Sequence, residues 1–577
     1  MKQILQNLSN GETSLVDVPA PRNIKANILI ATRNSLVSAG TERMLIDFGK
    51  SNLLNKAKQQ PDKVKMVLNK VVTDGLMTTI DAVRSKLDQP LPLGYCNAGI
   101  VLNSDSANFQ TGDRVVSNGN HAEVVRVPQN LCVKIPDGVD DESAAFTVLG
   151  SVGLQGIRLL QPTIGECFVV TGLGLVGLIC VQILRANGCR VLGVDFDSKK
   201  CELAREFGAE IVDLSKDEDP LIFSKGFSRG RGVDGVIITA STQSNEVIHQ
   251  SAEMCRKRGR IVLVGVVGLK LRREDFFKKE ITFQVSASYG PGRYDAFYEE
   301  EGNDYPIGFV RWTEQRNFEA VLDMMDSGTL NVQSLITHRY NIEDSVEAYT
   351  LLDNPLALGI VISYPNQDKK KLKTSKVKLL NNSSNEKVKT APCVGFIGAG
   401  NYASRILIPA FKETGAILDT IVSSEGVSGV HHGNKNGFLT ASTSIKDILN
   451  NKSINTVAIV TRHNDHAEQV VESLNAGKHV FVEKPLALTL DEINKIDEAY
   501  QENKKSKNLK LMVGFNRRFA PHIVKMKKLL ESHHSPKSIL MTINAGAIPD
   551  ESWVQDVLIG GGRIVGEGCH FIDLMRF

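Results

Sequence analysis

The segments "VTGLGLVGLICVQILRANGCRVLGVDFD" (170–197) and "VGFIGAGNYASRILIPAF" (394–411) each consist of a strand pattern, a tight glycine turn and a helix pattern. In the first segment, Gly172, Gly174 and Gly177 form a G-x-G-x-x-G motif. The first glycine permits the turn, the second lets the backbone approach a pyrophosphate, and the third lets helix and strand pack closely. Because the first turn of a helix has free N–H groups that bind phosphate, this segment predicts a dinucleotide site.

A carboxylate follows this turn at the spacing typical of nucleotide recognition. Asp195 lies 23 residues after Gly172 and ends the second strand pattern. At that place a carboxylate accepts hydrogen bonds from both ribose hydroxyls and repels a 2′-phosphate. We therefore expect NAD as the cofactor of the first half. A glycine turn with a purely structural role is the alternative.

The second turn has the G-x-G-x-x-A form, with Gly398, Gly400 and Ala403. The strand pattern that follows it, "ILDTIVSS", ends in two serines without a carboxylate. The second half is therefore predicted to bind NAD or NADP, and the sequence leaves the choice open.

Apolar strand patterns alternate with helical patterns in both halves of the chain. "CFVVTG", "RVLGVD", "VDGVIITA" and "GRIVLVG" occur within residues 143–290, and "INTVAIVTR", "KHVFVEKP" and "LKLMVGF" follow the second turn. This alternation predicts an α/β fold with doubly wound parallel sheets. Residues 366–390 hold eight lysines against two carboxylates and few core formers, which predicts a solvated linker.

Composition and charge narrow the class of protein. The 577 residues, 42% hydrophobic and 23% charged, are typical of an ordinary globular protein with several domains. The net charge of +3 is concentrated in the Lys-rich segment, so no basic face is expected for nucleic acid. The nine cysteines show no metal-ligand spacing, and neither a signal peptide nor a membrane span is indicated. We therefore expect a cytoplasmic protein.

The motifs of residues 1–364 resemble those of the medium-chain dehydrogenase/reductase (zinc-type alcohol dehydrogenase) superfamily. The resemblance rests on "SLVSAGTE" (35–42), "LGYCNAGIV" (93–101), the first glycine turn and "LITHRYNIEDSVEAY" (335–349). It implies a GroES-like β-rich catalytic domain next to a Rossmann domain.

The family's zinc ligands are replaced in this sequence. Ser38 is found where the family has its first cysteine, Tyr95 replaces the histidine of the G-H-E motif, and Cys96 follows it. Cys96 and His121 are candidate ligands without a third, so we expect no catalytic zinc. In that case side-chain donors would polarise a carbonyl, with Tyr95, Ser38, Thr41 and His121 as candidates.

Residues 288–317 form a loop rich in arginine, tyrosine and acidic residues. Arg293 and Arg311 are candidates for binding a substrate phosphate or carboxylate. Three tyrosines are candidates for stacking on a sugar or base: Tyr294, Tyr298 and Tyr305. A surface loop held by its own salt bridges is the equal alternative.

The motifs of residues 392–577 resemble those of the glucose–fructose oxidoreductase/inositol dehydrogenase (Gfo/Idh/MocA) family. The most specific is "AGKHVFVEKP" (476–485). The resemblance implies that Lys484 binds the reacting hydroxyl beside the nicotinamide, that Glu483 contacts the ribose, and that a cis bond precedes Pro485.

The acid/base motif of this family is altered. His570 matches the family's histidine, but Gly566 replaces its aspartate, and Glu567 is the candidate substitute. His466 keeps the family position in "TRHNDH" (461–466), where Arg462 and His463 replace the family's proline and asparagine. A helix-capping role for His463 and His466 is the alternative. A lysine and a histidine beside a carbinol suffice to hold the oxygen and exchange its proton.

In this family the "CHFIDL" helix leads into a large sheet that covers the cofactor. We therefore expect that the sequence is a fragment that ends inside this C-terminal domain, with exposed apolar surface near residue 577. The two resemblances together predict these domains: a GroES-like domain at 1–142 with a helical insert at 44–90, a Rossmann domain at 143–290, a return segment at 291–364, a linker at 365–390, a second Rossmann domain at 391–515 and the start of a substrate domain at 516–577.

The combination resembles the bi-domain oxidoreductases of bacteria. It implies an NAD(P)-dependent enzyme that acts on a sugar or nucleotide sugar in surface-polysaccharide metabolism, with two hydride-transfer sites. A dinucleotide-binding sensor or scaffold with inactive sites is the alternative, and a reductase of activated alkenes or quinones is a third reading of the first half. The sequence does not determine whether the protein is a homo-oligomer.

Overall fold

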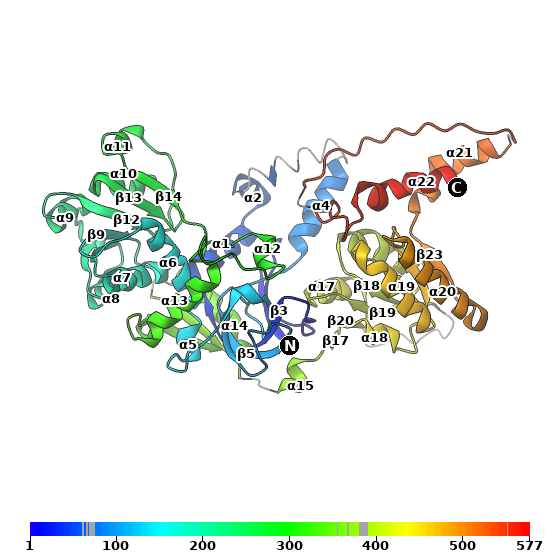
Figure 1. Cartoon of the computed structure of the whole chain (residues 1–577), viewed down its shortest axis with the longest axis horizontal. Helices are drawn as coiled ribbons and strands as arrows, with labels where there is room; N and C mark the ends of the chain where they lie inside the picture. The colour runs from blue at the N-terminus through cyan, green and yellow to red at the C-terminus, as the bar shows by residue number, and fades with distance from the viewer. Residues whose placement is uncertain are drawn as a thin grey trace. The chain divides into compact units, whose positions relative to one another are not determined.

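The computed structural model describes the chain except for residues 60–62, 65–66, 68–75, 355, 366–367, 380–390, 533 and 551. Its described residues form two compact units (Figure 1). The first unit comprises Met1–Asp17 and Asn23–Leu372, and the second comprises Val18–Arg22 and Lys373–Phe577. Within this described part, no helix has the combination of length and apolar character needed to cross a bilayer. The finer domain boundaries stay predictions.

A mainly antiparallel sheet forms the β-rich part of the first unit. Its strand order is β15-β16-β3-β5-β6-β8, with β7 paired to β3. The strands are β3 (Asn27–Val37), β5 (Asn97–Ser104), β6 (Arg114–Ser117), β7 (Val124–Pro128), β8 (Cys132–Lys134), β15 (Ile336–Asn341) and β16 (Gly359–Ser363). Because β16 pairs with β3, the chain returns after residue 335 to complete the sheet that begins at residue 27. A smaller sheet contains β1 (Lys2–Gln6), β2 (Thr13–Asp17) and β4 (Leu91–Pro92).

The second part of the first unit is a parallel six-stranded sheet. Its order, β11-β10-β9-β12-β13-β14, is the 3-2-1-4-5-6 order of a doubly wound fold. The strands are β9 (Cys167–Thr171), β10 (Arg190–Asp195), β11 (Glu210–Asp213), β12 (Val233–Ile238), β13 (Cys255–Leu263) and β14 (Thr282–Val285). The helices are α6 (Thr147–Leu160), α7 (Leu175–Ala186), α8 (Ser198–Glu206), α9 (Pro220–Phe227), α10 (Glu246–Met254) and α13 (Glu314–Asp326). Ligands of such folds bind at the carboxyl ends of the strands, where the order reverses.

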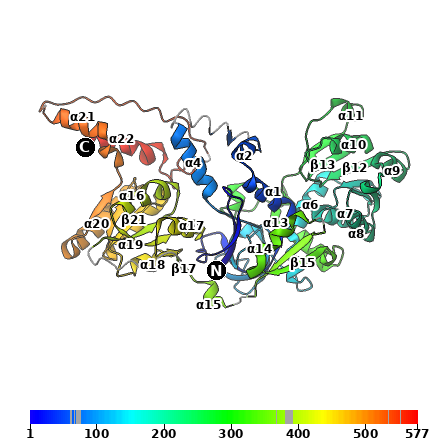
Figure 2. The same cartoon turned by 180° about the vertical axis from the view of Figure 1, so that it is seen from behind.

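The second unit repeats this topology. Its order is β17-β20-β19-β18-β21-β22-β23, in which the six later strands have the same 3-2-1-4-5-6 arrangement. The strands are β17 (Lys376–Lys378), β18 (Cys393–Ile397), β19 (Ile417–Val422), β20 (Thr440–Ser442), β21 (Thr456–Ile459), β22 (His479–Val482) and β23 (Leu511–Val513). Helices α19 (His466–Asn475) and α20 (Leu490–Lys507) lie side by side (Figures 1 and 2).

The predicted linker contains a strand, and the predicted helical insert is described only in part. Within the predicted linker, β17 pairs antiparallel with β20 and so belongs to the second sheet, because alternating Lys376 and Lys378 leave Val377 to face a neighbour. The short helix α15 (Lys369–Leu372) precedes it. In the predicted helical insert the structure describes α1 (Ala39–Lys50), α2 (Leu53–Gln59) and α4 (Leu76–Asp88); its other residues lie largely outside the described ones.

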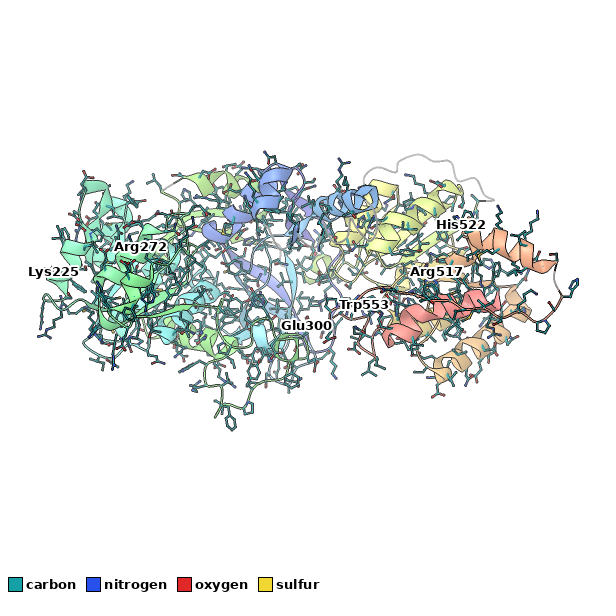
Figure 3. All side chains as sticks on the ribbon, turned by 90° about the horizontal axis from the view of Figure 1, so that it is seen from above. Lys225, Arg272, Glu300, Arg517, His522 and Trp553 are labelled. Atoms are coloured by element: carbon teal, nitrogen blue, oxygen red, sulfur yellow. The ribbon has the colours of Figure 1, made fainter. Side chains whose placement is uncertain are left out.

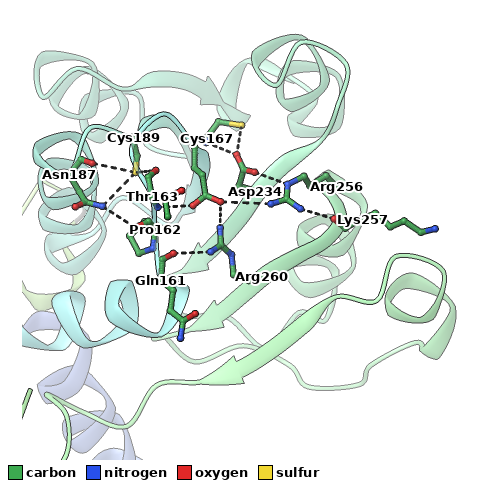
Figure 4. Close-up of polar contacts among 11 residues, drawn as sticks. Gln161, Pro162, Thr163, Cys167, Asn187, Cys189, Asp234, Arg256, Lys257 and Arg260 are labelled. Carbon is green, nitrogen blue, oxygen red and sulfur yellow. Dashed lines mark hydrogen bonds and ion pairs between the residues drawn. The ribbon is translucent and has the colours of Figure 1, made fainter. Parts of the chain in front are cut away.

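A polar network closes the amino ends of the first parallel sheet, opposite the expected ligand edge (Figure 4). Asp234 accepts a hydrogen bond from the Cys167 N–H at 2.8 Å and from Arg256 Nε at 2.6 Å. Burial alone would raise the pKa of Asp234, but these two donors together hold it below its ordinary value. Arg260 binds Glu166 in the same network at 2.5 Å. The network therefore links β9, β12 and β13.

We expect Asp234→Asn to lower the free energy of unfolding of the first unit by about 1–3 kcal/mol, because it removes the negative charge that pairs with Arg256. A depressed carboxyl pKa stabilises the fold above the ordinary value of about 3.9 and loses this effect as pH falls through the folded value. Urea unfolding at pH 7 and pH 3 measures both. Glu280→Gln, which removes an exposed pair with Arg258, is the control; equal effects of the two variants would contradict the prediction.

Candidate functional site

A cavity of about 920 Å³ lies in the first unit at the carboxyl ends of the parallel strands. Gly172, Gly174 and Asp195 line it from the doubly wound part, and Thr41 and Tyr95 line it from the β-rich part. The structure therefore brings the predicted cofactor residues and one predicted substrate residue to the same cavity.

The three glycines of the first turn have different surroundings. Gly172 has φ +94°, and a Cβ there would lie 2.6 Å from the Ala240 nitrogen. A Cβ on Gly177 would lie 2.0 Å from the Gly172 oxygen, which explains why only glycine fits between helix and strand. A Cβ on Gly174 would meet nothing within 4 Å. The cradle thus leaves open space for a diphosphate at the start of α7, where Gly174 is the N-cap without a side-chain cap.

Asp195 lies at the end of β10 and lines the same cavity. Its carboxylate accepts hydrogen bonds from the Leu173 N–H at 2.6 Å and from the Asp197 N–H at 2.9 Å. These contacts orient the side chain toward the turn, and each oxygen keeps a second lone pair. The arrangement fits the hydroxyls of an adenosine ribose.

Tyr95 carries a donor into the cavity. Its hydroxyl forms hydrogen bonds with Ser38 Oγ at 2.7 Å and Thr41 Oγ1 at 3.1 Å. Burial raises the pKa of Tyr95 far above its ordinary value, and the neighbouring Cys96 and Glu42 add to this effect. The phenol therefore stays protonated and can donate a hydrogen bond to a substrate oxygen.

His121 does not reach the cavity, which corrects its prediction as a substrate residue. The side chain is fully buried, and its ring nitrogens contact Ser35 Oγ at 2.7 Å and Glu42 Oε1 at 3.2 Å. Glu42 also accepts hydrogen bonds from the Ser38 N–H and the Tyr349 hydroxyl. The sequence reasoning missed Glu42, although the motif "SAGTE" contained it. The Glu42 carboxylate holds the Ser38 N–H, and Ser38 in turn binds the Tyr95 hydroxyl. This network therefore positions Tyr95.

The replaced zinc position keeps one thiol, that of Cys96. Cys96 is completely buried, and burial, followed by the charge of Glu42, raises the pKa of its thiol well above the ordinary value. In the described residues, no three His, Cys, Asp or Glu side chains form a group that could hold a metal ion. The expectation of a zinc-free site stays a prediction.

The predicted substrate loop is largely held by its own contacts. Arg293 pairs with Glu299 at 2.7 Å, so the alternative of an internal salt bridge describes this arginine. Tyr298 is buried and stacks on Tyr305 at 5.1 Å, and the Tyr305 hydroxyl binds Asp295. These side chains are not free to bind a substrate, because each already has an internal partner.

Two predicted residues of this loop face outward. Tyr294 is 79% exposed and lies beside the Arg293 guanidinium. Arg311 is exposed and lies over the ring of Trp312, with its Cζ 3.9 Å from the ring centroid. Neither residue lines the described cavity.

The second glycine turn has the same geometry as the first. Gly398 has φ +106°, and a Cβ there would lie 2.3 Å from the Val460 oxygen. A Cβ on Gly400 would meet nothing within 4 Å, so this cradle is also open. Ala403 is fully buried, which fits the helix-packing role of the third position. The helix contains a π-type turn at Ala403–Leu407, since Pro409 has no N–H for the fourth carbonyl before it.

Glu483 has a free acceptor in the second unit. It is 8% exposed, and its buried Oε1 has no hydrogen-bond partner in the structure. Burial raises the pKa of Glu483 to about 6. The Lys484–Pro485 bond is cis, as predicted. A buried, unpartnered carboxyl oxygen fits a cofactor hydroxyl or amide, which supports the predicted role of Glu483.

Lys484 is oriented by the C-terminal segment. Its Nζ donates to the Gly566 main-chain oxygen at 2.6 Å, which leaves two N–H groups for a ligand. A Cβ on Gly566 would lie 3.3 Å from Cε1 of His463 and 2.9 Å from the Gly560 oxygen. Gly566 therefore lies against His463, and a side chain at this position would first meet the Gly560 backbone oxygen.

His570 lies close enough to Lys484 for the two charges to interact. Burial, and then the charge of Lys484, lower the pKa of His570 to about 4, and its buried Nδ1 has no partner in the structure. Glu567 instead pairs with Arg563 at 2.5 Å, so it does not replace the lost aspartate as a partner of His570. The reason is helical spacing, because residues four apart face each other.

The helix that carries His570, α22 (Cys569–Arg576), is held by the segment after β23. Arg518 Nε donates to Asp573 Oδ2 at 2.6 Å, and its Nη2 binds the second oxygen. Cζ of Arg517, a residue labelled in Figure 3, lies 4.6 Å from the centroid of the Phe571 ring. These contacts hold α22, and with it His570, near Lys484.

His466 occupies a structural position, which corrects its prediction as a catalytic residue. The side chain is fully buried, and its Nδ1 and Nε2 contact the Pro485 and Thr461 oxygens at 2.6 Å and 3.3 Å. A neutral imidazole donates one hydrogen bond, here to a backbone carbonyl, and full burial keeps the ring from a substrate. His466 holds the turn that presents Lys484.

The predicted apolar surface near the C-terminus is present. Helix α21 (Pro521–Glu531) has no buried residue, and α22 buries only Asp573. Large apolar side chains that are 47–62% exposed on these two helices are Val524, Met526, Leu529, Ile572 and Met575.

Each half of the chain matches the model of a known protein family. The family model for zinc-binding dehydrogenases matches residues 176–301, and the model for the oxidoreductase family with an NAD-binding Rossmann fold, Gfo/Idh/MocA, matches residues 393–515. Sorbitol dehydrogenase of Halalkalibacterium halodurans is 23% identical over 274 residues, which cover 47% of this chain and 71% of that enzyme. The 1,5-anhydro-D-fructose reductase of Ensifer adhaerens is 27% identical over 189 residues, which cover 32% of this chain and 55% of that enzyme.

Among solved structures, alcohol dehydrogenase TADH from Thermus sp. ATN1 matches with a TM-score of 0.48 and 19% identity, over 63% of this chain and 100% of that one. The matched residues span 55–63% of the length of four of the curated relatives. One chain thus combines a zinc-type alcohol dehydrogenase (medium-chain) region with an NAD-binding Rossmann domain of the Gfo/Idh/MocA family.

Proposed function

We propose that this protein is an NAD(P)-dependent oxidoreductase with two nicotinamide sites that acts on a hydroxyl or carbonyl group of a sugar or nucleotide sugar. The observation that carries the proposal is the pair of open cradles, where a Cβ on Gly174 or Gly400 would meet no atom within 4 Å. Two relatives, named for sorbitol and for 1,5-anhydro-D-fructose, favour a polyhydroxylated substrate.

The geometry of the second unit supports a lysine–histidine mechanism. When bound, the nicotinamide supplies the hydride acceptor or donor. Lys484 uses its remaining N–H groups to hold the substrate oxygen, and the unpartnered Nδ1 of His570 accepts the hydroxyl proton during oxidation. In reduction the same proton returns to the carbonyl oxygen. Glu483 offers its free Oε1 to the cofactor.

In the first unit, Tyr95 is the donor best placed for a substrate oxygen. It lines the cavity with Thr41 and Ser38, and its hydroxyl is held by both. We infer that the protonated phenol polarises a carbonyl at this site. The position fits a zinc-free reaction, because the side chain occupies the place of a family zinc ligand.

A dinucleotide-binding sensor is the second candidate. The observation in its favour is that Glu567 pairs with Arg563, so His570 has no carboxylate partner. A sensor would bind the nucleotide without turnover.

Saturation binding of NAD(H) tests the number of sites. We expect two equivalents per chain, and one equivalent each in Gly174→Val and Gly400→Val, because valine would fill one cradle. Gly174 has φ −68°, so the substitution introduces no backbone strain. Isothermal titration calorimetry measures the stoichiometry. A single equivalent in the unmodified chain would contradict the proposal.

Substitution of Lys484 tests the reaction in the second unit. We expect Lys484→Ala to lower kcat about 100-fold or more while the dissociation constant of the nucleotide stays unchanged, since the lysine acts on the substrate oxygen. Absorbance at 340 nm during incubation with nucleotide sugars measures turnover. Lys495→Ala, an exposed lysine on α20, is the matched control. No turnover in the unmodified chain with intact nucleotide binding would favour the sensor.

The pH dependence tests His570 as the base. Since its pKa is lowered to about 4, the imidazole is neutral at pH 7, and kcat/KM for oxidation should stay level down to about pH 6 and fall toward pH 4. NMR titration of the ring proton, assigned by its loss in His570→Gln, measures the same pKa. Lys484→Met should raise this pKa, because it removes a neighbouring positive charge. A midpoint near 6.5 in the unmodified chain would refute the assignment.

A further inference from the structure

The end of β19 lacks the carboxylate that marks the nucleotide site of the first unit. The N–H of the first glycine of each turn donates to a strand oxygen at 2.9 Å, that of Val194 in the first unit and that of Val422 in the second. The next residue is Asp195 in the first unit and Ser423 in the second. The Ser423 hydroxyl accepts a hydrogen bond at 3.1 Å from the Gly429 N–H, in α17 (Val427–Asn436). The place of Asp195 therefore supplies no charge that would repel a 2′-phosphate.

A segment from near the N-terminus packs on this end of β19. Val18–Arg22 belongs to the second unit, although its neighbours in the sequence on both sides belong to the first. The Ala20 oxygen accepts a hydrogen bond from Thr443 Oγ1 at 2.6 Å. The Arg22 N–H donates to the Ser424 oxygen at 3.3 Å. These contacts place the Arg22 backbone directly beside the end of β19.

The segment is packed tightly against the second unit. Val18 is fully buried and Ala20 is 4% exposed, and two prolines restrict the backbone between them and Arg22. A Cβ on Gly426, which has φ +85°, would lie 2.8 Å from the Pro19 oxygen. The close approach of two backbones thus fixes the position of the segment, and the arginine that follows it is exposed.

The side chain of Arg22 acts on a second turn at the same edge of the sheet. Burial and the charge of Glu468 raise the pKa of Asp465, and the charges of Arg22 and Arg462 partly offset this rise. Asp465 lies between β21 and α19. Because β19 and β21 flank β18, after which the second cradle lies, Arg22 is found at the edge where dinucleotides bind in this fold.

A guanidinium at this edge matches the group that distinguishes NADP from NAD, the phosphate on the 2′ oxygen of the adenosine ribose. Its planar fork binds phosphate oxygens bidentately through charge-assisted hydrogen bonds. The competing feature is Glu425, which is exposed and follows Ser424, since a carboxylate accepts hydrogen bonds from ribose hydroxyls. The arginine is favoured because Ser423 occupies the strand-end position from which Asp195 excludes a phosphate, and because backbone contacts hold Arg22 beside it.

We propose that Arg22 binds the 2′-phosphate of NADP(H) in the second unit, so that the two units of one chain prefer different nicotinamide nucleotides. The proposal rests on the proposed function and names the cofactor that the sequence of the second half leaves open. A preference is a ratio of two affinities, so NAD(H) at saturation still fills the second cradle, with the weaker affinity.

Isothermal titration calorimetry of the full chain with NADP⁺ and with NAD⁺ measures the preference, in a Gly174→Val background that leaves only the second cradle open. We expect NADP⁺ to bind about tenfold or more tightly than NAD⁺, because it adds a charge-assisted contact. Arg22→Ala should remove this difference and leave NAD⁺ binding nearly unchanged. Arg22→Lys should keep part of it, since lysine keeps the charge without the fork. Lys412→Ala, an exposed lysine in the last turn of α16 (Ile408–Glu413), is the control and should change neither affinity.

The outcomes separate this assignment from the proposed function. A preference for NADP⁺ that is lost in Arg22→Ala with unchanged circular dichroism supports the assignment, even in a chain that turns over no sugar. A preference that survives in Arg22→Ala overturns it, and the proposed function stands. A preference for NAD⁺ overturns it as well, and weaker NAD⁺ binding in Glu425→Gln would then assign the ribose hydroxyls to Glu425. No binding of either nucleotide in the Gly174→Val background contradicts the two-site function and the assignment together.

Discussion

Both halves of this protein depend on the close approach of a helix to the strand before it. In the first turn a Cβ on Gly177 would lie 2.0 Å from the Gly172 oxygen, so no side chain is tolerated there. The same approach directs the free N–H groups of the first helical turn at the cradle. In the second turn Ala403 fills the third position, and Gly400 faces open space. The fold thus places two nucleotide cradles at the carboxyl ends of two doubly wound sheets.

The two units differ in how completely the buried polar groups near each cradle are hydrogen-bonded. In the first unit, His121, Glu42 and Tyr349 satisfy one another in a buried network, and Tyr95 remains as the donor that faces the cavity. In the second unit, Glu483 and His570 each keep a buried atom without a partner. An unpartnered buried polar atom is costly, and a bound ligand that supplies the missing hydrogen bond removes the cost. The two cradles therefore differ in their polar surroundings, which are satisfied internally in the first unit and left partly open in the second.

Much of the fold and part of the site followed from local patterns. Gly172, Gly174 and Asp195 were predicted to lie together because their spacing on a strand–turn–helix is fixed by covalent geometry. The roles of His121 and Glu567 were not predicted correctly, because their partners, Glu42 and Arg563, are distant in the sequence or one helical turn away. For Arg293, the sequence left a substrate role and an internal salt bridge open, and the structure has the salt bridge with Glu299. The strand β17 was missed for a similar reason, since three alternating residues form a strand only when β20 offers its edge.

The sequence by itself determined the two α/β units, the positions of both cradles and the lysine beside the cis proline, because these depend on glycine conformation, hydrophobic periodicity and motif spacing. Only the tertiary structure decided which polar side chains are free. Lys484 is aimed by the Gly566 carbonyl, 82 residues away, and Arg22 is held beside Ser424, in a distant part of the sequence, by a backbone hydrogen bond. Hydrogen bonding and charge pairing depend on distances in space, and those are set by packing that no local pattern encodes.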